Sequence, residues 1–255
     1  MNNAKLYEKK KIIQEYSNFS YLFKPELSIL NTLRNDLPEM KMLDIGVGGG
    51  RTTNHFAKFV KDYTAIDYSI GMINACKRKF KLNSDYKFLF CDVRNLQMFS
   101  DNQFDIVLFS YNGLDYISHN ERDLAFREIY RITKKEAYFV FSTHNLQCLN
   151  NLYRIKLTYN PLKLLKRVLK LFLILLFNGM PNRYSSKEFA IINDGAHRFC
   201  LKTYYIMPLK QIESLINIGF NRIKLFSIND GEEIQNADYK NVQDDWIYYF
   251  CRTLK

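Results

Sequence analysis

The chain has 255 residues, of which 47% are hydrophobic, and a formal net charge of +11 at pH 7. This length and apolar content exclude an intrinsically disordered chain and indicate one large domain, or one domain that carries an insert. The five cysteines lie far apart without a C-x-x-C pair, so we predict neither a metal site nor a disulfide framework and expect a reducing, cytoplasmic compartment.

Two explanations fit the positive charge. An anionic partner, such as nucleic acid, a membrane surface or a phosphorylated substrate, would select for it. The chain is also rich in Lys, Asn, Ile, Tyr and Phe, as an AT-rich coding sequence would make it. We favour this compositional explanation, because the sequence has no dense Lys/Arg tail and its basic residues occur along most of the chain.

Residues 1–37 are predicted to form an N-terminal helical cap. Residues 1–11 are polar and lysine-rich, so no signal peptide is expected. Helices are predicted over 5–17 and 25–33, the second with a proline in its first turn. Both precede the first strand and could cover a ligand crevice, with Tyr16 and Phe19 either closing over the substrate or packing in the core.

A glycine-rich loop follows the first predicted strand, which covers residues 41–45. Asp44 lies near the end of that strand, and a helix is predicted over 51–60. Glycines between a strand and a helix allow a ligand to approach the backbone, and the helix N-terminus offers free N–H groups. The dinucleotide fingerprint G-x-G-x-x-G is incomplete, because Arg51 occupies the third glycine position. The loop glycines are Gly46, Gly48, Gly49 and Gly50.

Two further predicted strands, 63–67 and 87–91, are followed by acids at the same edge of the sheet. Asp67 ends the first of them, and a carboxylate at this place can accept hydrogen bonds from both ribose hydroxyls of an adenosine. Ser69 is expected to cap the next helix. Asp92 and Val93 follow the other strand.

A fourth strand is predicted over 104–109, followed by the turn Ser110-Tyr111-Asn112-Gly113. A helix over 120–132 and a strand over 137–142 continue the alternation, and His144 follows at the same edge. Open α/β sheets bind ligands outside the carboxyl ends of their strands. These residues therefore belong beside any ligand that lies across the glycine loop.

The alternation stops in an insert, residues 146–202. Within it, 161–177 is predicted to be an amphipathic helix with four cations on one face. The segment is too short and too charged to span a bilayer. It could be a lid helix over the acceptor site, a membrane-surface helix or a dimer contact. The later part of the insert, including Asp194, His197 and Arg198, could line the acceptor pocket.

The final segment, 203–255, is predicted to complete the sheet. A helix over 208–218 ends at Gly219. The strands 222–228 and 246–252 have no helical pattern between them, so they are expected to pair as an antiparallel hairpin.

Together these motifs resemble the class I S-adenosylmethionine (SAM) dependent methyltransferases. Asp44-x-Gly46-x-Gly48-x-Gly50 resembles their first motif, the segment from Asp67 to Met72 resembles a D-x-S-x-x-M segment, and the Phe-Asp-x-Val opening at 104 resembles their fourth motif. The resemblance implies a Rossmann-like, doubly wound α/β fold with a mostly parallel seven-stranded sheet, an antiparallel last strand and a helical lid. It implies SAM as cofactor, bound by Asp44, Gly46, Gly48, Gly50, Asp67, Tyr68, Met72, Asp92, Val93 and Ser110.

The expected reaction is methyl transfer to a hydroxyl or amine of a small molecule or glycan precursor, as in polysaccharide biosynthesis. His144 is the main candidate base, with His119 and His197 behind it, and Tyr111, Asn112 and Asp115 are acceptor-site candidates. A cytoplasmic protein with a peripheral membrane contact through 161–177 is a further expectation. The alternatives are an RNA methyltransferase, disfavoured because no RNA-binding module or Asn/Asp-Pro-Pro-Tyr segment is present, and a non-catalytic scaffold.

Overall fold

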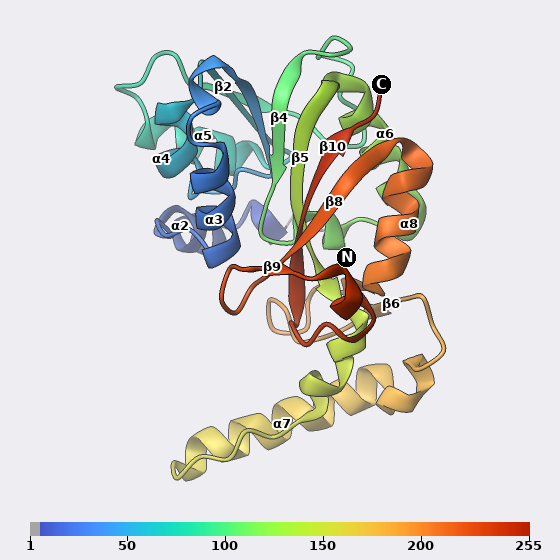
Figure 1. The fold of residues 1–255 in the computed structure, drawn as a ribbon. Coiled ribbons are helices and arrows are strands. Elements are labelled where there is room, and N and C mark those ends of the chain that lie inside the picture. Colours follow the sequence, from blue (N-terminus) through green and yellow to red (C-terminus); the bar gives the residue numbers. More distant parts are fainter. Residues whose placement is uncertain (1–5) are drawn as a thin grey trace.

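A computed structural model of the chain describes residues 6–255. The first five residues of the predicted cap, including the expected start of its first helix, lie outside the described residues. The described part is built on one mixed sheet with the order β3-β2-β1-β4-β5-β10-β8-β9, with β7 pairing β5 and β6 pairing β7 (Figure 1). The strands are β1 (Lys41–Ile45), β2 (Asp62–Asp67), β3 (Lys87–Phe90), β4 (Phe104–Phe109), β5 (Thr133–Asn145), β6 (Phe189–Ile192), β7 (Thr203–Ile206), β8 (Phe220–Ser227), β9 (Glu233–Ile234) and β10 (Trp246–Thr253).

The parallel part of the sheet confirms the predicted α/β fold. Strands β1 to β5 are parallel neighbours, and β10 runs antiparallel to both β5 and β8. β10 lies between β5 and β8 in the sheet, which confirms the predicted antiparallel pair at the end of the chain. The predicted seven strands correspond to β1–β5, β8 and β10, and the described chain adds β6, β7 and β9 to them.

Helices cover both faces of this sheet (Figure 1). Because side chains alternate along a strand, Leu43 and Val107 belong to one apolar core, together with α6 and Leu215 of α8. Met42 and Leu108 face the other core, packed by α3 and α5. The helices are α2 (Lys10–Ser17), α3 (Lys24–Leu33), α4 (Thr53–Phe56), α5 (Ile70–Lys79), α6 (His119–Ile132), α7 (Pro161–Asn178) and α8 (Pro208–Ile218).

Two sequence predictions require correction. The expected helix over 51–60 is only the four-residue α4 followed by the 3₁₀ turn Ala57–Phe59, because the chain continues in turns through residue 52. The loop therefore has no long helix behind it and no substantial helix dipole. The insert and its border also contain strands that were not predicted. β6 pairs antiparallel with β7, and β7 pairs in parallel with the last residues of β5, where His144 lies opposite Tyr205.

The insert also contains α7, which confirms the helix predicted over 161–177. α7 lies beyond the end of the sheet and projects away from the body of the molecule (Figure 1). Among residues 6–255, no helix combines the length and the apolar character needed to cross a bilayer.

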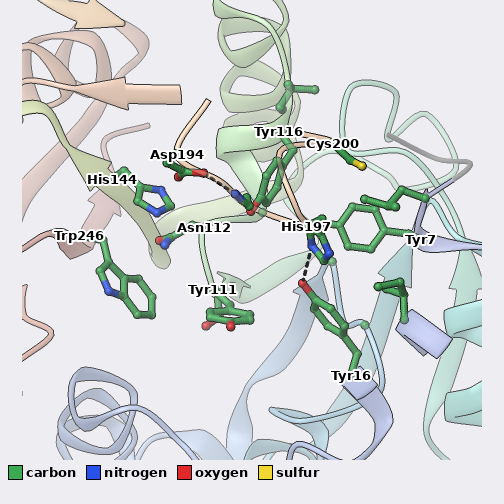
Figure 2. Close-up of a pocket in the computed structure, with 18 of the residues that line it drawn as sticks. Tyr7, Tyr16, Tyr111, Asn112, Tyr116, His144, Asp194, His197, Cys200 and Trp246 are labelled. Carbon is green, nitrogen blue, oxygen red and sulfur yellow. Dashed lines mark hydrogen bonds between the residues drawn. The ribbon is translucent and has the colours of Figure 1, made fainter. Parts of the chain in front are cut away.

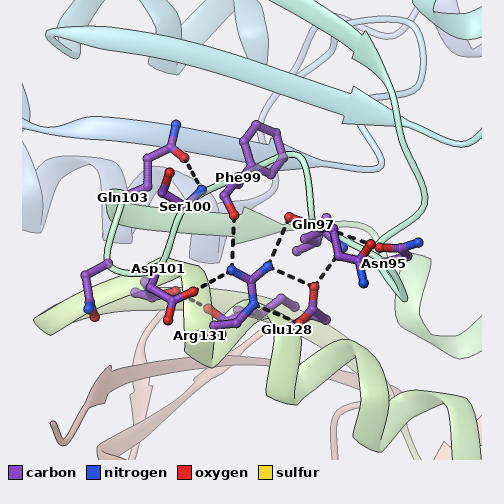
Figure 3. A network of polar contacts seen from close by, with 12 residues as sticks. Asn95, Gln97, Phe99, Ser100, Asp101, Gln103, Glu128 and Arg131 are labelled. Carbon is purple, nitrogen blue, oxygen red and sulfur yellow. Dashed lines mark hydrogen bonds and ion pairs between the residues drawn. The ribbon is translucent and has the colours of Figure 1, made fainter.

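An arginine of α6 fixes the loop between β3 and β4 (Figure 3). The Arg131 guanidinium donates to the carbonyl oxygens of Leu96 and Phe99, both at 3.0 Å, and pairs with Asp101 at 2.7 Å and Glu128 at 2.9 Å. The Leu96 carbonyl oxygen also accepts from the Phe99 N–H at 2.9 Å, so Arg131 adds a second donor to this irregular segment. These contacts hold the loop that leads from β3 past Asp92 against a helix.

A buried ion pair connects the N-terminal cap to the glycine loop. Both guanidinium NH2 groups of Arg51 donate to the carboxylate of Glu26, at 2.5 and 2.6 Å, and both side chains are almost fully buried. The hydroxyl of Tyr248 on β10 donates to the same carboxylate at 2.8 Å, and Ser110 at the end of β4 hydrogen-bonds with all three. One cluster therefore joins α3, the glycine loop, β4 and β10.

Removing the charge of Glu26 should destabilise the fold strongly. Glu26→Gln keeps the side-chain shape but leaves Arg51 buried without a counter-ion, a change that typically costs about 3–5 kcal/mol. The free energy of unfolding, measured with urea, should fall by that amount. Glu39→Gln is the matched control, because Glu39 faces Lys61 at 4.0 Å with both side chains exposed and should change little. Equal losses in the two variants would contradict this role for the pair.

Candidate cofactor and acceptor site

One large cavity lies along the carboxyl ends of the parallel strands. Its volume is about 2200 Å3, and its wall includes the three acids predicted from three different strands, Asp44, Asp67 and Asp92. The three carboxylates thus face a shared space, as a ligand that crosses neighbouring strand ends requires. Other predicted site residues in the wall are Gly46, Gly48, Tyr68, Met72, Val93, Ser110, Tyr111 and His144.

Among the predicted cofactor-binding residues and acceptor-site candidates, Gly50 and Asp115 do not line this cavity. Gly50 has a φ of +78°, and a Cβ on it would lie 2.5 Å from the Phe80 ring. Only glycine fits this conformation and this close contact, so Gly50 is needed for the path of the loop and not for ligand contact. Asp115 is buried beneath His144. Sequence spacing placed both residues at the carboxyl edge of the sheet. It could not distinguish residues that line the cavity from residues buried behind its wall.

Asp67 is held by backbone amides. Its Oδ2 accepts from the Gly48 N–H at 2.9 Å, and its Oδ1 accepts from the Ser69 N–H at 2.8 Å. Gly48 has a φ of +54°, which aims its N–H across the loop. Burial raises the pKa of Asp67 to about 6, despite these hydrogen bonds. The Ser69 hydroxyl also accepts from the Met72 N–H at 3.2 Å, so the expected helix cap is present.

Asp44 is buried more deeply. Its Oδ2 accepts from the Thr52 hydroxyl at 2.5 Å and from the Tyr63 hydroxyl at 2.6 Å. Burial raises the pKa of Asp44 to about 6, and the two hydroxyls only partly offset this. The cavity wall therefore carries two carboxylates whose charged form is costly in the free protein. A cationic or hydrogen-bond-donating ligand would offset that cost.

Asp92 differs from the other two acids because it already has a basic partner. The Arg94 guanidinium donates to Oδ1 at 2.9 Å and to Oδ2 at 2.6 Å. Partial burial opposes ionisation of Asp92, but the hydrogen bonds from Arg94 outweigh it and lower the pKa of this acid. A ligand amino group at Asp92 would share an oxygen with Arg94.

Ser110 lines the cavity, but its hydroxyl is engaged in the Glu26–Arg51 cluster. No sequence pattern indicates this contact, because Glu26 lies 84 residues earlier in the chain. Ser110 positions Arg51 at the base of the glycine loop.

Aromatic rings from four segments of the chain lie in the wall of the cavity (Figure 2). The Tyr7 ring contacts those of Tyr16, Tyr68, Tyr116 and His197 with ring centroids 5.5–6.2 Å apart. The Tyr16 hydroxyl and the Nε2 atom of His197 are 3.5 Å apart, which joins α2 to the insert across the cavity. Sequence reasoning left Tyr16 open and missed Tyr7 and Tyr116, which no local pattern distinguishes from core aromatics.

His144 and Asp115 form a dyad at the other side of the cavity. The Nδ1 atom of His144 lies 2.7 Å from Oδ2 of Asp115, which also accepts from the His144 backbone N–H at 2.8 Å. Arg122 pairs with Oδ1 at 2.9 Å. An ionised carboxylate only accepts hydrogen bonds, so Nδ1 carries the proton and Nε2 is the basic nitrogen. The candidate His119 instead bonds with Tyr204 at 2.7 Å and stacks on Phe189.

The turn after β4 is strained beside this dyad. Tyr111 and Asn112 have φ values of +57° and +58°, a conformation that side-chain-bearing residues rarely adopt and that often marks functional sites. Asn112 is 5% exposed, and its Oδ1 has no hydrogen-bond partner among residues 6–255. Its side chain lies between His144 and Tyr111, opposite Trp246 (Figure 2). Buried acceptors without a partner are uncommon, and this one belongs to a residue of the cavity wall beside His144.

Known proteins share both the motifs and the fold. Residues 42–136 match the family model described as a methyltransferase domain. A demethylmenaquinone methyltransferase of Renibacterium salmoninarum is 35% identical over 98 residues, 38% of this chain and 38% of that protein. The malonyl-[acyl-carrier protein] O-methyltransferase of Buchnera aphidicola is 25% identical over 95% of this chain and 93% of its own length.

Solved structures agree. A putative SAM-dependent methyltransferase from Listeria monocytogenes aligns with a TM-score of 0.61 at 17% identity, covering 91% of this chain and 99% of its own. The N-methyltransferase NodS from Bradyrhizobium japonicum, in complex with S-adenosylhomocysteine, aligns at 0.56 and 12% identity over 96% and 98%. Residues 42–136 are therefore similar to a methyltransferase domain, and the chain shares the fold of SAM-dependent methyltransferases. SAM is the cofactor of that domain.

The cavity fits SAM on two grounds. Its two desolvated carboxylates, Asp44 and Asp67, suit a ligand that carries an ammonium, a sulfonium and a ribose diol. The positive-φ glycines bring bare backbone to the same wall. No group of His, Cys, Asp and Glu suited to a metal occurs within residues 6–255.

Cofactor affinity should depend on pH near 6. Asp44 and Asp67 have pKa values of about 6 in the folded chain, so lowering the pH from 7.5 to 5.5 protonates both. A protonated acid loses its charge and part of its accepting capacity, so binding of S-adenosylhomocysteine should weaken by about fourfold for each acid that must be ionised. Calorimetry at the two pH values measures this.

The same acids should change the stability of the ligand-free chain in the opposite direction. Their folded pKa lies above the unfolded value near 3.9, so the folded state binds more protons between pH 4 and 6. Their contribution to the free energy of unfolding therefore rises as the pH falls from about 6 to 4.

The affinity prediction has its own contrary outcome. Cofactor affinity that is unchanged between pH 7.5 and 5.5 would contradict a role for these carboxylates.

Proposed function

We propose that this chain transfers the methyl group of SAM to a hydroxyl or amine of a small molecule or glycan precursor. The observation that carries the proposal is the His144–Asp115 dyad in the wall of the same cavity as the glycine loop and its acids. The relatives named for demethylmenaquinone and malonyl-[acyl-carrier protein] support a small-molecule acceptor over RNA. All five cysteines are free, which supports a cytoplasmic location.

On the cofactor side, each part of SAM is proposed to meet the residues at the end of a different strand. Asp67 accepts from the ribose hydroxyls, Asp44 serves the cationic amino-acid end, and Asp92 with the Val93 N–H binds the adenine. Gly46 and Gly48 bring the backbone close, while Gly50 shapes the loop. Tyr68 and Met72 pack against the base, and Ser110 acts through Arg51.

On the acceptor side, the chain positions a nucleophile and removes its proton. Bound SAM supplies a methyl group that its sulfonium makes electrophilic. The acceptor O–H or N–H donates to Nε2 of His144, which takes the proton as the new bond forms, while Asp115 holds the imidazole in this tautomer. Asn112 Oδ1 orients a second donor of the acceptor, and Tyr111 packs beside it.

Asp67→Ala should weaken cofactor binding without unfolding the chain. Loss of a charge-assisted contact to the ribose costs about 2 kcal/mol, roughly a thirtyfold loss of affinity. Calorimetry with S-adenosylhomocysteine measures it. Asp62→Ala is the control, because Asp62 begins the same strand at its opposite end, half exposed. Equal affinities for the two variants would reject the assignment.

His144→Gln should slow methyl transfer while cofactor binding stays within about twofold. Loss of a general base typically costs about 100-fold or more in turnover. Transfer of label from methyl-labelled SAM would be followed with quinols, carrier-bound acids, sugar nucleotides and mixed RNA as acceptors. His119→Gln is the control, because His119 lies off the cavity. Equal turnover of the two variants would exclude His144 as base, and transfer to RNA alone would overturn the acceptor class.

A further inference from the structure

The insert holds most of the positive charge of the chain. Residues 146–202 contain ten Lys and Arg against two acids, Glu188 and Asp194, which gives +8 of the total of +11. The basic residues occur along most of the chain, as predicted, but this segment has only two acids to offset them, so most of the net charge lies here. The ten cations are Arg154, Lys156, Lys163, Lys166, Arg167, Lys170, Arg183, Lys187, Arg198 and Lys202.

These cations are not neutralised within the molecule. Across residues 6–255, the ion pairs of the structure include none of the ten. Of the two acids, Glu188 pairs with Lys210, outside the insert. The helix α7 itself contains four of the cations and no acid. The insert thus presents an uncompensated positive surface.

One stripe of α7 attaches the helix to the molecule. The residues of this stripe follow each other at alternating intervals of three and four, and all are buried or half-buried. They are Leu164, Arg167, Leu171, Ile174 and Asn178. The Asn178 amide donates to the Asn193 carbonyl oxygen at 2.9 Å and accepts from the Asn193 N–H at 2.8 Å. Arg167, Leu171 and Ile174 also line the large cavity.

The opposite stripe of α7 is apolar and exposed. Its residues follow the same intervals of three and four, and each lies two positions before a residue of the attached stripe. Each is 52–70% exposed: Leu162, Leu165, Leu169, Phe172 and Leu176. Half of the large exposed apolar residues of the described chain, 12 of 23, lie within the insert. Contiguous apolar surface of this kind marks an interaction site. Lys163, Lys166 and Lys170 are exposed along one side of this stripe.

We propose that the outer stripe of α7 docks on an anionic phospholipid bilayer. An interfacial helix buries its apolar face at the level of the headgroups, and its lysines contact lipid phosphates from the edge of that face. A second copy of the chain would bring lysines against lysines, with no acid on α7 to pair them. A nucleic acid would place its charged phosphates against the five large apolar side chains of the outer stripe, which is unfavourable.

Docking would place the acceptor side of the cavity at the bilayer, because α7 supplies part of the cavity wall from its inner stripe. In this respect the inference rests on the proposed methyl transfer and deepens it. The acceptor would be an amphiphile that lies in the membrane and presents its hydroxyl or amine to His144.

Vesicle flotation with the full chain tests the docking. We expect binding to vesicles of 70% phosphatidylcholine and 30% phosphatidylglycerol, and weak binding to phosphatidylcholine alone. Leu165→Asp with Phe172→Asp should abolish binding to both. Lys163→Glu with Lys166→Glu should weaken binding to the anionic vesicles by about fivefold or more for each lysine. The control is Leu82→Asp, because Leu82 is 90% exposed but lies outside the insert.

Affinity for S-adenosylhomocysteine, measured on each variant, reports folding of the cofactor half and separates this test from that of the proposed function. Equal flotation of wild type and the Leu165/Phe172 variant would overturn the proposal, as would failure of wild type to bind anionic vesicles. A lipid-independent dimer that the same variant dissociates, seen by sedimentation, would assign the stripe to a second copy. Salt-dependent RNA binding without vesicle binding would assign the charge to nucleic acid.

Discussion

The buried pair of Glu26 and Arg51 is the interaction on which the rest of the site depends. A carboxylate from the N-terminal cap and a guanidinium from the glycine loop can stay buried only because each satisfies the other, with Tyr248 and Ser110 supplying the remaining hydrogen bonds. The cluster fixes where α3, the glycine loop, β4 and β10 meet. Arg51 and Ser110 also line the cavity, so the cluster connects the cavity wall to the N-terminal cap.

The acids of the cavity illustrate how a binding site can be costly to the free protein. Asp44 and Asp67 are desolvated without a directly paired cation, whereas Asp92 is paired and has a lowered pKa. Backbone amides and hydroxyls orient the two unpaired acids before any ligand arrives. Such preorganisation moves the cost of desolvation from the binding step to folding.

The sequence predicted the parallel strands and their terminal acids because each strand is a short apolar run that ends in Asp or in a polar turn. It overestimated the helix after the glycine loop, since apolar spacing does not reveal how long a glycine turn continues. It missed β6 and β7, whose four residues are stabilised by pairing with each other and with β5. It also could not predict the partners of Ser110 and Asp115, because Glu26, Arg122 and His144 reach them from distant parts of the chain.

The two stripes of α7 link the outside of the molecule to its interior. The Asn178–Asn193 pair clamps one end of this helix, while the other end projects beyond the sheet. Arg167 and Leu171 belong to the inner stripe of the same helix and line the cavity. If the outer stripe rests on a membrane, as we propose, the space open to an acceptor depends on how that surface holds the helix.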